Sequence, residues 1–139
     1  MKIIQKTILI PAKPRGFHLI THKIVEALPQ IEEFQAGLCH LFLMHTSASL
    51  TINENADPSV REDFLKFTNH LVPETFPYSH TLEGSEDMPA HIKGSLYGNA
   101  LTIPITAGRL VLGTWQGIYL CEHRDFSSNR KIYATLMGE

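Results

Sequence analysis

The sequence predicts a mainly β protein on the border with α+β, built as an antiparallel β-sandwich with two or three short helices. Apolar segments of strand length outnumber the segments whose apolar residues recur at helical spacing. These strands are not regularly interleaved with helices, which argues against a doubly wound α/β fold. No long linker, low-complexity tract or internal repeat interrupts the 139 residues, so a single domain over 1–139 is expected.

The elements of the N-terminal part follow from apolar spacing and breakers. A strand over 3–10 is expected to end at the breaker region from Pro11 to Pro14. Thr21 is a candidate cap for a short helix whose apolar residues run to Leu28, and Pro29 limits its length. The apolar run from Gly37 to Met44 predicts a strand that is buried on both faces.

One longer helix and several further strands are expected in the rest of the chain. Asp57 followed by Pro58 is a good helix start, and apolar residues then repeat every three or four positions through His70. A short helix is expected from Pro89 to Tyr97. The remaining predicted strands span 49–52, 100–105, 110–114, 116–121 and 131–136.

Composition excludes several classes of function. The net charge is −2 and the Lys and Arg residues are scattered, which argues against a nucleic-acid surface. No apolar stretch approaches the roughly 20 residues that span a bilayer, and the N-terminus lacks the pattern of a signal peptide. Cys39 and Cys121 lie in apolar runs, as buried reduced thiols do, so we expect a cytoplasmic protein without a membrane partner.

A first polar cluster follows the predicted buried strand directly. His45 ends the apolar run, and polar residues continue as far as Asp57, with Ser47 and Glu54 among them. Polar side chains at the end of a rigid element are held still, as catalysis and metal binding require. A satisfied core histidine followed by an ordinary turn would give the same pattern.

A second polar cluster lies between Tyr78 and Ser95, in a long irregular segment that leads into a short apolar face. Together with the first cluster it could supply three imidazoles, those of His45, His80 and His91, to a divalent cation. Three protein ligands with an open position are typical of catalytic zinc. We therefore expect these ring nitrogens to lie within roughly 5 Å of one another, around zinc or magnesium.

A third informative stretch surrounds the single tryptophan. Gly113 and Gly117 flank Trp115, which predicts a crowded, largely buried Trp115 close to the polar clusters. Arg124 and Arg130 follow, and their guanidinium groups could hold a phosphate or carboxylate. A buried tryptophan pinned between strands beside a solvated hairpin tip would equally explain this stretch.

In this order, the three stretches resemble the YjbQ family, known as secondary thiamine-phosphate synthases. The matching segments are His45–Thr51 with Asn53–Asn55 and Asp57, Glu83–Lys93, and Gly108–Ile118 with Glu122–Arg124. The resemblance implies a β-rich sandwich that assembles as a homotrimer, with a polar cleft lined by histidines. It also implies the joining of a pyrimidine methyl pyrophosphate to thiazole phosphate, with release of pyrophosphate.

The expected site has three groups of residues and acts on a small phosphorylated substrate. The catalytic candidates, some of them acids, bases or orienting groups, are His45, Glu54, Asp57, Asp87, Lys93 and His123. The phosphate-binding candidates are Ser47, Arg124 and Arg130, and the metal candidates are His45, His80 and His91. Two alternatives remain open, namely a metal-assisted hydrolase of a small substrate and a non-enzymatic trimeric module that binds a metal or an anion.

Overall fold

The computed structural model describes residues 1–139 and confirms the predicted antiparallel, mainly β architecture with short helices. The elements are β1 (Lys2–Ile10), β2 (Gly16–Leu19), α1 (Thr21–Ala27), the 3₁₀ helix η1 (Pro29–Glu33), β3 (Ala36–Leu43), β4 (Ala48–Glu54), α2 (Pro58–Leu71), α3 (Asp87–Tyr97), β5 (Ala100–Thr106), β6 (Arg109–Leu110), β7 (Gln116–Glu122) and β8 (Arg130–Gly138). None of the helices has the length and apolarity that a membrane crossing requires.

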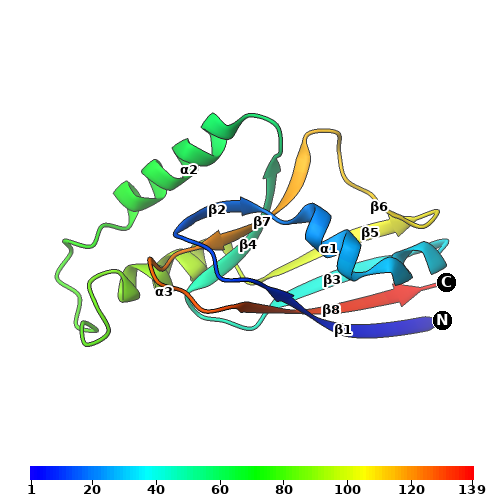
Figure 1. Ribbon diagram of the computed structural model, residues 1–139, viewed down its shortest axis with the longest axis horizontal. Coiled ribbons are helices and arrows are strands. Elements are labelled where there is room, and N and C mark those ends of the chain that lie inside the picture. The colour runs from blue at the N-terminus through cyan, green and yellow to red at the C-terminus, as the bar shows by residue number, and fades with distance from the viewer.

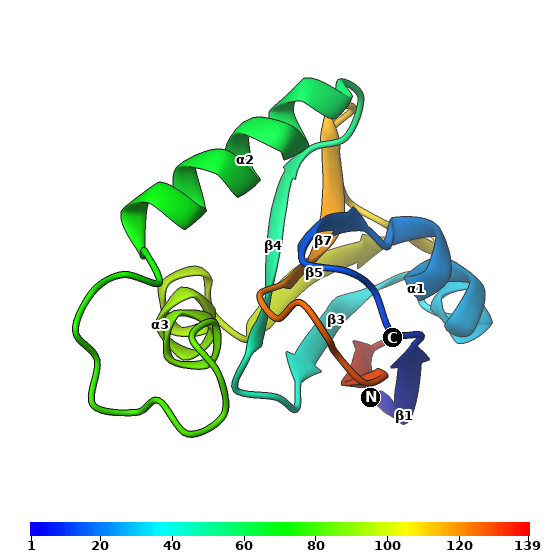
Figure 2. The same cartoon turned by 60° about the vertical axis from the view of Figure 1, so that its left-hand side comes forward.

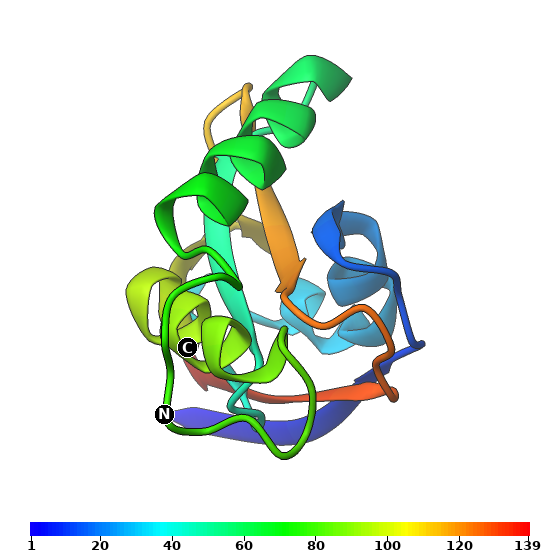
Figure 3. The same cartoon turned by 90° about the vertical axis from the view of Figure 1, so that its left-hand side faces the viewer.

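The strands form two sheets (Figure 1). One sheet has five strands in the order β1-β8-β3-β5-β6, and the other has three in the order β2-β7-β4. Figure 3 shows the five-stranded sheet on one side of β4 and β7, and α2 on the other side. The main apolar core fills the space between the sheets, where Leu41 and Leu136 face Leu50 and Leu120.

A second, smaller apolar cluster lies between the three-stranded sheet and the helices. Phe17 of β2 stacks on Phe64 of α2 at 5.2 Å between ring centroids, and its edge meets Tyr97 of α3 at 5.4 Å. Tyr119 and Cys121 of β7 complete this cluster. It fixes α2 and α3 against the sheet and so positions the polar residues at the start of α3.

The prediction that β3 is buried on both faces is wrong. Cys39, Leu41 and Leu43 are buried, but Leu38 and Phe42 are each 42% exposed. Successive side chains of a strand point to opposite faces, and in the single chain no layer covers the outer face of the five-stranded sheet. The apolar run therefore predicted the strand correctly, but its prediction that the second face is also buried failed.

Helix α2 begins as predicted. Asp57 caps it by accepting a hydrogen bond from the Ser59 amide at 2.9 Å, and Pro58 is the first helical residue. The expected apolar face is covered only in part, because Phe67 is 62% exposed while Phe64 is packed against Phe17.

The predicted role of Thr21 needs correction. Thr21 is the first residue of α1 rather than its cap, and its hydroxyl accepts a hydrogen bond from the Ile118 amide of β7 at 2.8 Å. The side chain thus ties α1 to the three-stranded sheet.

Both cysteines are free and fully buried, as predicted. Burial disfavours the thiolate and raises the pKa of Cys39 to about 11 and that of Cys121 to about 12. Neither thiol is therefore a candidate nucleophile.

The prediction of a buried Trp115 is also wrong, because this side chain is 66% exposed in the loop before β7. The close packing around Gly117 explains why this position is a glycine. A Cβ atom on Gly117 would lie 2.6 Å from Leu19 Cδ2 and 3.0 Å from Asn55 Cβ. Crowding by neighbouring strands, rather than by a ligand, accounts for this glycine.

Candidate metal centre

His80, Asp87 and His91 converge where the long loop after α2 meets α3. His80 Nε2 lies 2.8 Å from Asp87 Oδ2, and His91 Nε2 lies 3.0 Å from the same oxygen. The three candidate ligand atoms all lie within 4.8 Å of one another. Asp87 is 1% exposed, whereas both imidazoles are partly open to solvent.

Local structure explains how these residues meet. Asp87 and His91 are four residues apart on α3 and so share one face of the helix. A carboxylate in the first helical turn is also favoured by the helix dipole. His80 comes from the loop that joins α2 to α3 (Figure 2), in which Tyr78 donates a hydrogen bond to the Pro73 carbonyl at 2.8 Å.

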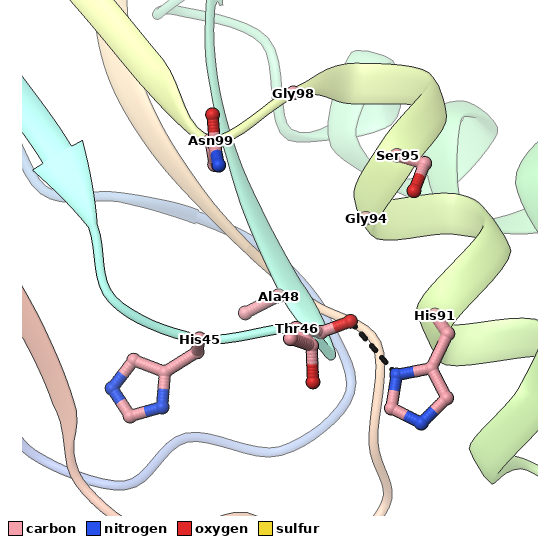
Figure 4. A pocket seen from close by; sticks show the side chains of 8 residues that line it. All are labelled: His45, Thr46, Ala48, His91, Gly94, Ser95, Gly98 and Asn99. Atoms are coloured by element: carbon pink, nitrogen blue, oxygen red, sulfur yellow. Dashed lines mark hydrogen bonds between the residues drawn. The ribbon is translucent and has the colours of Figure 1, made fainter.

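The orientation of His91 is fixed by a backbone group. Its Nδ1 lies 2.9 Å from the carbonyl oxygen of Thr46 (Figure 4). A carbonyl can only accept, so Nδ1 carries the proton and Nε2 faces Asp87. This arrangement is how metal-ligating histidines are commonly oriented, with one nitrogen held by the backbone and the other presented to the metal.

Arg124 contacts the Asp87 carboxylate at Oδ1, the oxygen that faces away from the histidines. Its guanidinium lies 3.4 Å from Asp87 Oδ1 and donates to Glu86 Oε1 at 3.2 Å. Burial opposes ionisation of Asp87, but the hydrogen bond from His80 and the charges of His91 and Arg124 outweigh it and lower the pKa of this carboxyl. Arg124 therefore holds Asp87 ionised and leaves Oδ2 directed toward the histidines.

Two imidazole nitrogens and one carboxylate oxygen fit a divalent transition metal with open coordination positions. Sets of two histidines and one acidic residue occur in catalytic zinc sites and in non-haem iron sites. Magnesium prefers oxygen ligands in octahedral geometry, so this donor set favours zinc over magnesium.

A polar cavity of about 590 Å³ adjoins this cluster and shares His91 with it (Figure 4). Its wall comes from the turn between β3 and β4, from α3 and from the link between α3 and β5. Ala48 is the one apolar residue among its eight lining residues. The cavity therefore suits a small polar molecule placed beside the cluster.

The structure does not bring His45 into the metal cluster, and Asp87 takes the third position that the sequence assigns to His45. Figure 4 shows the imidazoles of His45 and His91 on either side of Thr46. His45 Nε2 instead accepts a hydrogen bond from the Lys131 amide at 2.8 Å. The predicted set of three histidines is thus corrected to His80, Asp87 and His91.

Arg130 and Ser47, which the sequence predicts to bind phosphate, are hydrogen-bonded to each other, and Arg130 is also bonded to Glu122. Arg130 is 4% exposed, and its Nε donates to Glu122 Oε1 at 2.7 Å. Its Nη2 donates to Ser47 Oγ at 3.0 Å. Nε and Nη2 of Arg130 are thus taken up by a buried carboxylate and by Ser47.

His123 and Lys93 are 2% and 1% exposed, and neither lines the cavity. Lys93 Nζ donates to Asn69 Oδ1 at 2.7 Å, and desolvation, with the nearby charge of Arg15, lowers its pKa to about 8. Desolvation, followed by the charge of Lys93, lowers the pKa of His123 to about 3, and its Nε2 lies 2.8 Å from Ser49 Oγ. Neither side chain can therefore contact a substrate in the cavity, as the predicted catalytic roles require.

Glu54 and Asp57 lie at the far end of β4 and serve the backbone there. Glu54 accepts hydrogen bonds from the amides of Ala56 and Asp57, and Asp57 caps α2. Their predicted role in orienting the histidines is therefore wrong, whereas Asp87 does contact both His80 and His91.

The buried neutral His123 predicts acid sensitivity of folding. In the unfolded chain this imidazole takes up a proton below about pH 6.5, but in the folded protein it does so only near pH 3. The stability it contributes is complete above pH 6.5 and is lost as the pH falls toward 3. Between pH 7 and pH 5, His123→Gln should lose about 1–2 kcal/mol less stability than the wild type in urea unfolding. Equal losses in the two proteins would contradict this assignment.

Comparison with known proteins confirms the resemblance seen in the sequence. A family model described as UPF0047 protein YjbQ-like matches residues 6–139. The UPF0047 protein YjbQ of Salmonella typhimurium is 53% identical over 135 residues, which cover 97% of this chain and 98% of that protein. UPF0047 protein YugU of Bacillus subtilis is 37% identical, over 96% and 98% of the two chains.

Solved structures show the same fold. A YbjQ-like protein of unknown function from Sulfolobus solfataricus superposes with a TM-score of 0.87 at 26% identity, and the match covers 99% of both chains. An uncharacterized YjbQ/UPF0047 protein from Clostridium acetobutylicum has a TM-score of 0.82 at 36% identity, over 96% and 99% of the chains. The fold, the sequence identities and the family model together show that this chain belongs to the YjbQ/UPF0047 family.

Proposed function

We propose that this protein is a zinc-dependent enzyme that acts on a small phosphorylated substrate. The observation that carries the proposal is the convergence of His80, Asp87 and His91 beside a polar cavity that shares His91 with them. Support also comes from the Thr46 carbonyl, which turns His91 Nε2 toward the candidate ligand position.

Four residues of the site have a defined part in this proposal. His80, Asp87 and His91 hold the cation, and Arg124 keeps Asp87 ionised and oriented. The cavity takes the substrate from the side of His91. When bound, zinc would supply Lewis acidity to a phosphoryl oxygen or activate a water molecule near neutral pH.

Thiamine-phosphate synthesis is a specific reaction of this kind, because a cation would neutralise its pyrophosphate leaving group. The family resemblance supports it. The cavity wall holds no Phe, Tyr or Trp on which a pyrimidine or thiazole ring could stack, and Ala48 is its one apolar residue. The geometry therefore favours metal-assisted hydrolysis or transfer at a phosphate group more strongly than the joining of two rings.

Metal content and turnover together test the proposal. The purified protein, and the same protein after chelator treatment and zinc reconstitution, should be assayed with 4-nitrophenyl phosphate and with the two thiamine precursors. We expect one zinc per chain and a zinc-dependent turnover of at least one of these substrates. Stoichiometric zinc without turnover would favour the metal-binding module, and absence of zinc binding would refute the proposed site.

We also propose that the chain assembles as a homotrimer. The outer face of the five-stranded sheet exposes apolar side chains of β1 and β3, among them Ile3, Leu9 and Phe42. This sheet also has two open edges. β6 pairs with β5 only at Ile105 and Thr106, so the apolar segments 101–105 and 110–112 lie at one edge, and β1 is the free strand at the other. Light scattering should give three times the chain mass of 15.6 kDa, and a single-chain mass would contradict assembly.

A further inference from the structure

The outer face of the five-stranded sheet carries a row of polar side chains that crosses four strands. The register of β1, β8, β3 and β5 places one residue of each strand in this polar row, namely Gln5, Thr135, His40 and Thr102. Cross-strand partners share a face, and His40 lies between the buried Cys39 and Leu41, so the row points outward. Gln5 Nε2 donates a hydrogen bond to Thr135 Oγ1 at 3.2 Å, and His40 Nδ1 lies 2.8 Å from Thr102 Oγ1.

Mainly apolar rows flank the polar row on both sides. In register across the four strands they are Ile3, Met137, Leu38 and Pro104 on one side, and Thr7, Tyr133, Phe42 and Ala100 on the other. Ile3 is 59% exposed, and Leu38 and Phe42 are each 42% exposed. A contiguous apolar surface of this kind marks a contact with a partner rather than a surface made for water.

Formal charge is nearly absent from this face. The outward positions of β1, β8, β3 and β5 include one lysine, Lys131, and no Asp or Glu. The face therefore lacks the basic charge that binds nucleic acid or an anionic membrane. It also brings no like charges together at its centre when it meets a second copy of itself.

The chemistry of the polar row favours an identical partner. Hydroxyl, amide and imidazole groups can all donate and accept hydrogen bonds. His40 Nε2 and Gln5 Oε1 have no hydrogen-bond partner within the chain. If the face is buried against an apolar partner, these atoms lose water and gain nothing in return. A second polar row can satisfy them, so another copy of this chain is the partner that fits.

We infer that the outer face is the contact surface between copies of this chain, and that the polar row sets their register by pairing with the polar row of a neighbouring copy. The inference rests on the proposed homotrimer and deepens it by naming the residues that select one arrangement. Buried polar residues act in this way in coiled coils, where a single one can fix register and oligomeric state at a cost in stability.

Charge placed on the face tests whether copies meet there. Phe42→Lys puts an ammonium group beside the polar row, and we expect it to weaken assembly at least about tenfold in light scattering over a dilution series. Phe67→Lys is the matched control and should keep the wild-type mass, because Phe67 is 62% exposed on α2, away from this face (Figure 3). Leu38→Lys, on the other side of the polar row, repeats the test if Phe42→Lys lowers the stability of the chain.

Substitution of His40 tests the polar row itself. His40→Leu makes the centre of the face apolar, so copies should still associate but in more than one register. We expect two or more masses in light scattering where the wild type gives one. His40→Gln keeps a donor and an acceptor and should restore the single mass. His22→Leu is the control, because the His22 side chain is 90% exposed on α1, and it should leave the mass unchanged.

The possible outcomes separate this inference from the proposals on which it rests. A single-chain mass for the wild type would contradict the homotrimer, and the inference would fall with it. A wild-type trimer that survives both Phe42→Lys and Leu38→Lys would overturn the inference and leave assembly to another surface. A single trimeric mass for His40→Leu would likewise overturn the role of the polar row. Zinc binding decides the proposed enzyme separately, because the substituted residues lie outside the metal cluster.

Discussion

Replacement of Asp87 by Asn is expected to weaken zinc binding by more than about 100-fold, beyond the roughly 10- to 100-fold loss typical of residues that only orient a ligand. Asp87 is the single anionic donor of the cluster, and its Oδ2 lies within 3.0 Å of both histidine nitrogens. The amide keeps the shape of the side chain but removes its charge. Competition with a coloured zinc chelator measures the affinity directly, without any knowledge of the substrate.

Asp125 provides a matched control for this substitution. Its carboxylate accepts a hydrogen bond from Arg15 at 2.8 Å, and its side chain is 48% exposed. Asp125→Asn removes the same charge close to Arg124 without touching either histidine, so its zinc affinity should stay within about threefold of the wild type. If the Asp87 and Asp125 variants bind zinc equally well, Asp87 is not a ligand.

The absence of Asp87 from the predicted metal ligands has a simple cause. The sequence predicts a short helix that begins at Pro89, whereas α3 begins at Asp87. With the helix started two residues earlier, the spacing of Asp87 and His91 would have placed both on one helical face. Helix ends are the least certain feature of sequence interpretation, and here the boundary decided the ligand set.

Other features of the site depend on contacts that are distant in the sequence. The Lys131 amide that donates to His45 lies 86 residues away, and the Thr46 carbonyl that orients His91 lies 45 residues away. Local patterns, by contrast, were sufficient for the first strand, for the Asp57 cap of α2 and for the buried thiols. Sequence patterns thus revealed which segments carry polar groups, but not which of those groups satisfy one another.

The sequence predicts phosphate binding by Arg130 because a guanidinium group can form paired hydrogen bonds to a phosphate or a carboxylate. Its actual partner is Glu122, the last residue of β7, which is 1% exposed. The two residues are eight positions apart across the turn from β7 to β8, a spacing that fits neither a helix nor a tight hairpin. Pairing of this kind becomes visible only when the strands are placed in their sheets.

Substitution of Arg130 by Met is expected to lower the free energy of unfolding by about 3–5 kcal/mol, since it leaves the carboxylate of Glu122 buried without a positively charged partner and with only the Arg124 amide as a donor. Urea denaturation at neutral pH measures this loss. The exposed pair of Lys2 and Glu33 is a matched control, because its side chains are 47% and 49% exposed. Lys2→Met should therefore cost less than about 1 kcal/mol.

The double variant Glu122→Gln with Arg130→Met separates the cost of an unpaired charge from the value of the pair itself. Removal of both charges avoids the buried carboxylate, so the double variant should be more stable than Arg130→Met alone. If the single variant were instead as stable as the wild type and the loss appeared only in phosphate affinity, Arg130 would be a ligand-binding residue after all. A loss of stability with unchanged phosphate affinity would identify the pair as a structural element that ties the start of β8 to Ser47 and to the end of β7.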